Sequence, residues 1–520
     1  MARGRITFWL FAASLTAACG GARRGHDSVR APDVRAARLA CSVAPSAAVI
    51  RADDFDPTSS RPEDEAKAAE LLALPAPISE APPRFSPDGK LVAFVGSGEV
   101  GNGGVGNPGV GNRGVGSQGG NQAGRSLYVQ ESSAGAKARR IPVELPKRFL
   151  RPLFSPDGQY IYFTTDQDGD EAFSIDRIDL RSGALEEVTG GEKRKRTGPF
   201  FAKSGRILDR FLFTCRKLDQ RGLVLYEQAA RPGSAGVELY EQADRYLAAV
   251  RPDLEQIVVG ELSQARALWV IDVERPKAGE LRAASEPRQL YPLGDLVAKG
   301  ARVQAVEYAP DGDRVFVATD EGGQRTHVVA LDARTGREIK RFTEPCIPGG
   351  DVQGMVAAGD SIAFIVDLGT HHQLRVLDAR TLEPRAPAKL GFGSEVPGSS
   401  HPNNTSGLAI SPDGKYLAVQ WSTPSSPPRV QLVDTHSGSI TPLTDAPPPD
   451  GPEMDVQVVR VPSFDGLEIP TLVYRSKDGE KHPVVMQIHG RFAYASTARS
   501  HGRTPRAWPS WGAARADTTR

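Results

Sequence analysis

The chain has 520 residues, of which 39% are hydrophobic and 24% are charged, so it is long enough for two or more domains and has an ordinary globular composition. Its 64 Lys and Arg residues nearly balance its 63 Asp and Glu residues, which leaves a formal net charge of +1. This balance argues against nucleic-acid binding and against recruitment to a membrane surface by bulk charge, because both require concentrated basic charge.

The N-terminus carries the pattern of a bacterial lipoprotein signal. A basic start at residues 1–5 precedes the apolar run 6–18, which is too short to span a bilayer, and small residues stand directly before Cys19. The pattern predicts a cleaved signal at residues 1–18 and lipidation of Cys19, with the protein held on the periplasmic side of the cell envelope. A secretory signal in which Cys19 is incidental is the alternative.

The next segments predict little packed structure. Residues 19–61 are rich in Ala, Arg, Asp and Ser without apolar periodicity, which is typical of a flexible tether. Residues 62–81 hold a short helix-like run that ends at Pro75. The three remaining cysteines, Cys41, Cys215 and Cys346, are too widely spaced for a metal site or a disulfide framework, so we expect buried free thiols, with one disulfide bridge as the alternative.

A Ser-Pro-Asp-Gly turn between two apolar runs begins a repeating unit. Pro fixes the backbone φ at the first corner of the turn, and Asp and Gly tolerate the conformations of the remaining corners. The turn therefore joins antiparallel strands. Full and weaker copies recur about every fifty residues once a Gly-rich insertion is set aside. One turn position in each copy is Asp88, Asp157, Gly205, Asp253, Asp311, Asp360 and Asp413.

A further pair of strands follows most of these turns, as at residues 173–183, 328–336 and 430–438. Four strands in each period of about fifty residues are typical of a propeller blade. The sequence therefore predicts an all-β, seven-bladed β-propeller over residues 82–450. The insertion at residues 100–119 is four Gly-rich pentapeptides, which we expect to form a disordered surface loop rather than a phosphate cradle.

Residues 451–490 resemble the start of an α/β-hydrolase domain. Ser463–Pro470 is similar to the opening strand of the catalytic domain in the prolyl oligopeptidase family of serine peptidases, in its acylaminoacyl-peptidase and dipeptidyl-peptidase-like branch. Residues 482–490 resemble the next buried strand and the His-Gly turn that helps to build the oxyanion hole of that family. The resemblance covers residues 82–490 and implies hydrolysis of oligopeptides, with the propeller gating access.

The resemblance stops at Arg491. Residues 491–520 contain six Arg, Trp508 and Trp511, but no Val, Ile or Leu, so they cannot continue the sheet. We interpret the chain as truncated at the start of the catalytic domain, by a frameshift or an early stop, with a natural basic tail as the alternative. Strands such as residues 472–474 and 484–488 would then lack sheet neighbours.

The chemistry expected of the family is absent from these 520 residues. No Gly-x-Ser-x-Gly nucleophile elbow occurs, so the Ser-Asp-His triad is missing, and His489 and Gly490 remain only as a remnant of the oxyanion loop. Glu171, in an Asp-Gly-Asp-Glu stretch at residues 168–171, is a weak candidate for holding a substrate amine. The surrounding residues 166–171 fit a polar hairpin end better than a calcium loop.

No cofactor or metal is predicted. His371 and His372 are adjacent, so on a strand they would face opposite ways, and we expect solvated loop histidines rather than metal ligands. The alternative to an inactive peptidase propeller is a non-catalytic periplasmic propeller lipoprotein of the Tol type, acting as a binding scaffold. The hydrolase-like residues 463–490 distinguish the two interpretations, because a binding scaffold does not need the beginning of a hydrolase domain.

Overall fold

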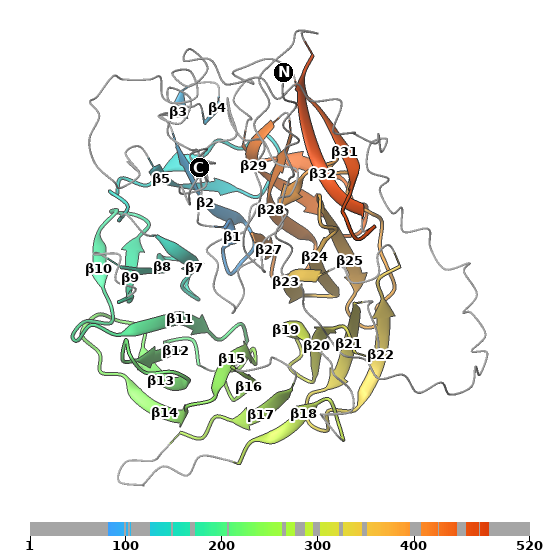
Figure 1. Cartoon of the computed structure of the whole chain (residues 1–520). Coiled ribbons are helices and arrows are strands. Elements are labelled where there is room, and N and C mark those ends of the chain that lie inside the picture. The colour runs from blue at the N-terminus through green and yellow to red at the C-terminus, as the bar shows by residue number, and fades with distance from the viewer. Residues whose placement is uncertain are drawn as a thin grey trace, which may run out of the picture. The chain divides into compact units, whose positions relative to one another are not determined.

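The computed structural model describes residues 82–97, 100–101, 104–105, 125–146, 149–166, 172–204, 207–262, 267–275, 286–294, 302–321, 326–345, 351–395, 407–424, 426–444, 454–466 and 468–477. All regular elements in these ranges are strands, and they include no helix that could cross a membrane. The predicted seven-bladed propeller is confirmed, because most of the strands form seven antiparallel sheets, here called blades 1 to 7 (Figure 1).

The first four blades each contain four strands in sequence order. Blade 1 is β1 (Arg84–Phe85), β2 (Leu91–Ser97), β5 (Arg125–Glu131) and β6 (Arg139–Arg140). Blade 2 is β7 (Leu150–Phe154), β8 (Tyr160–Thr165), β9 (Ser174–Asp179) and β10 (Leu185–Glu187). Blade 3 is β11 (Lys195–Phe201), β12 (Arg210–Arg216), β13 (Leu223–Ala229) and β14 (Val237–Gln242). Blade 4 is β15 (Arg245–Val250), β16 (Gln256–Glu261), β17 (Leu268–Asp272) and β18 (Arg288–Tyr291).

The last three blades differ in their strand number. Blade 5 is β19 (Val303–Tyr308), β20 (Arg314–Thr319), β21 (His327–Asp332) and β22 (Glu338–Thr343). Blade 6 is β23 (Asp351–Ala358), β24 (Ser361–Asp367) and β25 (His372–Asp378). Blade 7 is β26 (Ser394–Glu395), β27 (Leu408–Ile410), β28 (Tyr416–Thr423), β29 (Ser426–Asp434) and β30 (Ile440–Pro442).

Blade 6 lacks the predicted fourth strand. The segment after β25 makes only an isolated bridge, between Leu377 and Pro384. Proline has no backbone N–H to donate, so Pro384 and Pro387 prevent a regular ladder there. In blade 7 the innermost strand is divided, because β26 and β27 both pair with β28.

The second strand of each blade is apolar on both faces because another blade packs against each face. In β20, Val315 and Val317 join the core shared with blade 4, whereas Phe316 and Ala318 join the core shared with blade 6. This alternation is the two-residue period of a strand. Each Val or Phe side chain of this kind stabilises the fold by roughly 1.5–3 kcal/mol when it is fully buried.

The blades form a closed ring. Seven clusters of buried apolar side chains in the described residues match the seven interfaces between neighbouring blades. The closing cluster combines Phe85 and Val92 of blade 1 with Ala418 and Leu432 of blade 7. In Figure 1 the blue strands of blade 1 accordingly lie beside the orange strands of blade 7.

The Ser-Pro-Asp-Gly turns gather at one edge of the ring, here called the turn edge. Each lies between the first and second strands of its blade, as the sequence predicted. Turns of neighbouring blades touch: a Cβ added at Gly89 would lie 3.3 Å from Pro412, and Lys203 donates its backbone N–H to Pro252 (2.8 Å). Because the strands alternate in direction, the innermost strands begin at the opposite edge, here called the connecting edge.

Two short hairpins lie outside the seven blades. β31 (Met454–Pro462) pairs with β32 (Glu468–Ser476), so the expectation that residues 472–474 lack a sheet neighbour is wrong: Val458 faces Leu472. Residues 484–488 lie outside the described ranges. In the Gly-rich insertion, β3 (Val100–Gly101) pairs with β4 (Gly104–Val105), which corrects the expected disordered loop for those residues only.

Candidate functional site

The predicted site residues fall outside the part of the chain that the structure describes. Cys19, Glu171, His489 and Gly490 all lie beyond the described ranges. Asp166, at the start of the expected polar hairpin end, is described and is buried rather than exposed. Any site in the described residues therefore has to be found from the structure itself.

The turn edge is built from groups that satisfy one another. Ser86 donates its hydroxyl to Asp88 Oδ1 (2.6 Å), Lys90 donates its backbone N–H to the same oxygen (3.1 Å), and Leu91 N–H donates to Ser86 Oγ (2.9 Å). The Ser86 hydrogen bond is the main reason that the pKa of Asp88 is lowered. Ser411 and Asp413 repeat this arrangement in blade 7, so these carboxylates shape turns and are not poised for binding.

Two arginines occupy the innermost strands of blades 1 and 2, which contact each other. Arg84 in β1 donates from its Nη1 to the carbonyl oxygens of Pro83 (3.0 Å) and Leu408 (3.1 Å), and so joins blade 1 to blade 7. The pKa of Arg84 is lowered to about 10, mainly by burial and also by repulsion from Arg151, while the Glu395 carboxylate acts in the opposite direction. The two guanidinium groups are therefore close enough to repel each other.

Arg151 sits on a strained backbone. Its φ is 54°, a left-handed value that is costly for a residue with a Cβ, and it lies where the pairing of β7 with β8 shifts register between Leu150 and Leu153. Burial lowers the pKa of Arg151 to about 10, although part of the side chain stays accessible. Bulges of this kind re-aim side chains and are frequent beside functional sites.

Glu395 completes a group that we call the arginine cluster: Arg84, Arg151 and Glu395. Glu395 ends β26, is 0% exposed, and donates its backbone N–H to His372 Nδ1 (3.2 Å). Two cations and one carboxylate leave one positive charge in the cluster. The arrangement fits an anionic ligand, and it offers no nucleophile with an adjacent base.

The expectation of solvated histidines is wrong. His371 and His372 are 4% and 2% exposed. The His371 ring lies 4.9 Å from that of Phe392, and burial lowers its pKa to about 4. His372 Nε2 lies 4.0 Å from Asp367 Oδ2. Within the described ranges, no group of three His, Cys, Asp or Glu side chains could hold a metal ion.

The arginine cluster has only a faint signal in the sequence. Arg151 stands between apolar neighbours in a strand, where a charge is unusual, but arginines are common and the chain has many. Cys215 is buried as a free thiol, as expected, while Cys41 and Cys346 lie outside the described ranges.

Comparison with known proteins supports the fold. No protein-family model matches the chain, and no curated protein sequence matches it. A solved structure from a structural and mechanistic study of two prolyl endopeptidases has a similar fold, with a TM-score of 0.54 and 16% sequence identity over 80% of this chain. The chain spans 60% of the length of that structure.

Proposed function

We propose that this chain is the propeller portion of a serine peptidase of the prolyl oligopeptidase family, and that it admits oligopeptides to the middle of its ring. The observation that carries the proposal is the propeller shared with a prolyl endopeptidase over 80% of this chain. The hydrolase-like residues 463–490 add support, because they follow the last blade where a catalytic domain would begin.

This chain is proposed to bind peptides without hydrolysing them. Its 520 residues contain no Gly-x-Ser-x-Gly, and a nucleophile activated by an adjacent base is required for acyl transfer.

The test measures binding and cleavage on the same purified chain. Fluorescein-labelled oligopeptides of six to ten residues, with and without proline, are titrated by anisotropy, and each mixture is then analysed by mass spectrometry. We expect saturable binding and intact peptides. Cleavage would overturn the inactivity, and absence of binding to any peptide would overturn the peptidase-propeller assignment in favour of a scaffold of the Tol type.

The envelope location is proposed from the N-terminal signal alone. A lipid at Cys19 would hold the propeller at the periplasmic side of a bacterial membrane. Expression in a bacterium supplied with labelled palmitate tests this, with Cys19→Ala as the matched variant. We expect label on the wild-type chain and none on the variant, whereas equal labelling, or none on either chain, would contradict the anchor.

A further inference from the structure

Arg151 is a partly buried cation without a counterion among the described residues. In these residues, no hydrogen bond or ion pair links its side chain to another group, and no neighbouring carboxylate contributes to its lowered pKa. A charge that is partly removed from water without a partner destabilises a protein, and the φ of 54° at the same residue adds strain. Neither feature helps the fold, so both indicate a role in binding.

Arg84 has a structural task that Arg151 lacks. Its hydrogen bond to Leu408 joins the first blade to the last, and its charge is partly offset by Glu395. The second cation therefore adds nothing to ring closure. Instead, Arg151 adds positive charge where the innermost strand of blade 1 contacts the innermost strands of blades 7 and 2. Both arginine residues remain partly accessible there.

We infer that Arg151, with Arg84 beside it, binds the free C-terminal carboxylate of an oligopeptide in the middle of the ring; this rests on the proposed function. A guanidinium presents parallel N–H donors that match the two oxygens of a carboxylate. A peptide amine is repelled by the same pair. The cluster thus selects the orientation in which a peptide enters, with its carboxylate toward blades 1 and 2.

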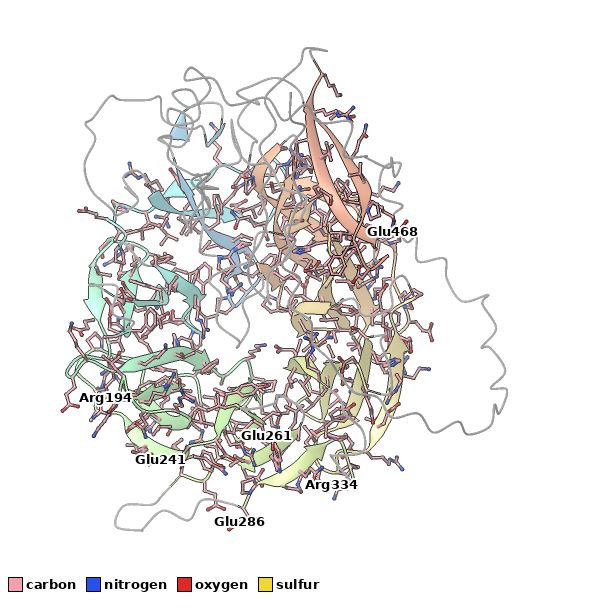
Figure 2. All side chains as sticks on the ribbon, viewed as in Figure 1. Arg194, Glu241, Glu261, Glu286, Arg334 and Glu468 are labelled. Atoms are coloured by element: carbon pink, nitrogen blue, oxygen red, sulfur yellow. The ribbon has the colours of Figure 1, made fainter. Side chains whose placement is uncertain are left out.

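The experiment compares two peptides that differ only at the C-terminus. A fluorescein-labelled heptapeptide with a free carboxylate and the same peptide as a C-terminal amide are titrated by anisotropy into the full chain. The variants are Arg151→Gln and, as a matched control, Arg334→Gln. Arg334 is an exposed arginine in the turn after β21, and it lies at the periphery of the ring in Figure 2.

We expect the wild-type chain to bind the acid about tenfold or more tightly than the amide, the range of a hydrogen bond to a charged group. Arg151→Gln should lose this preference and Arg334→Gln should keep it. If the acid and the amide bind equally to the wild-type chain, the inference is overturned, while the peptide-binding function stands.

A second measurement separates failure of the site from failure of the function. Thermal unfolding of the wild-type chain and of Arg151→Gln is followed with and without citrate, a small carboxylate. If neither peptide binds but citrate raises the Tm of the wild-type chain and not that of the variant, the carboxylate site is supported and the peptide is the wrong ligand. If citrate acts on both chains equally or on neither, and no peptide acid is preferred, the site is excluded.

Without ligand, Arg151→Gln should unfold at a higher temperature than the wild-type chain, because the variant no longer holds an unpaired charge in a partly buried position. A purely structural arginine would show the reverse, a lower Tm on substitution. This readout does not depend on the identity of the ligand, and a lower Tm for the variant would count against a binding role.

Discussion

Arg375 and Glu344 form a buried ion pair that links blade 6 to blade 5. Both hydrogen bonds, from Nε to Oε2 and from Nη2 to Oε1, are 2.9 Å long, and the side chains are 3% and 1% exposed. Such a pair specifies which groups meet at the interface, even where two apolar residues would stabilise it equally well.

Removing one partner of this pair should destabilise the propeller strongly. Arg375→Met leaves the Glu344 carboxylate buried without its cation, and we expect a loss of about 3–5 kcal/mol in the free energy of unfolding. Urea denaturation measures it. The exposed pair Arg460–Glu468 provides the control, since Arg460→Met should cost about 0–1 kcal/mol. Equal losses in the two variants would show that the blade 5–6 pair contributes no more than a surface contact.

Gly336 should not tolerate a Cβ. Its φ is +70°, and an added Cβ would lie 2.3 Å from the backbone oxygen of Leu290 in blade 4. Gly233 has nearly the same φ, +72°, with no atom within 4 Å. Gly233→Ala should therefore lower the free energy of unfolding by about 1–2 kcal/mol, because of its backbone conformation alone. Gly336→Ala should lower the free energy of unfolding by at least about 1 kcal/mol more, because of the clash. Thermal unfolding of both variants gives the difference, and equal costs would contradict the close approach between blades.

His371 should make the stability sensitive to pH. Its pKa is lowered to about 4 by burial, whereas an unfolded histidine titrates near 6.5. As the pH falls below 6.5 the unfolded chain takes up the proton first, so this stability is present above pH 6.5 and is lost progressively toward pH 4. The loss between pH 7 and pH 5 is about 2 kcal/mol.

His371→Phe keeps an aromatic ring against Phe392 but does not titrate, so its unfolding free energy should change less between pH 7 and pH 5. Urea denaturation at both pH values measures the change. His436→Gln, at an exposed ring, should leave the wild-type dependence on pH in place. The assignment to His371 fails if the phenylalanine variant retains the full dependence.

Aspartates in the turns between third and fourth strands should govern stability in acid. Asp332 Oδ1 accepts from the backbone N–H and the hydroxyl of Thr335, both at 2.7 Å, and these bonds lower its pKa. Asp434 is held in the same way by Ser437. Since the unfolded carboxyl titrates near 3.9, their contribution is present above that pH and is lost as the pH falls through the lower folded value.

Asp332→Asn removes this charge and keeps an acceptor oxygen. The Tm of the variant should lie below that of the wild-type chain at pH 6, and the gap should narrow at pH 2.5. Calorimetric scans across this range check the trend. A gap that stays constant with pH would mean that the Asp332 carboxylate contributes through shape and not through charge.

The propeller could be predicted because the residues that specify each turn are adjacent in the sequence and the pattern recurs from blade to blade. Each full copy of the turn is specified by four consecutive residues, and the apolar second strands follow from being covered on both faces. The absence of a fourth strand in blade 6 also has a signal in the sequence, because Pro384 and Pro387 have no backbone N–H to donate to a ladder.

The interior polar groups could not be predicted, because residues distant in the chain create their surroundings. His371 and His372 follow a Gly-Thr pair and look like loop residues, yet Phe392 and Glu395, about twenty residues later, cover them. Likewise, ring closure brings β1 against β27 of blade 7, and the packing of blade 1 on blade 2 brings β1 beside β7, so Arg84 and Arg151 carry no joint pattern along the chain.

The hydrogen bond from Arg84 to Leu408 connects residues that are 324 positions apart. In a chain that folds from its N-terminus, the face of blade 1 that carries Phe85 has no apolar partner until Ala418 and Leu432 are in place. The earliest part of the propeller is thus the last to be covered, and its apolar face stays open to aggregation in the interval. A circular permutant that begins between two other blades would move this vulnerable seam and leave the finished ring unchanged.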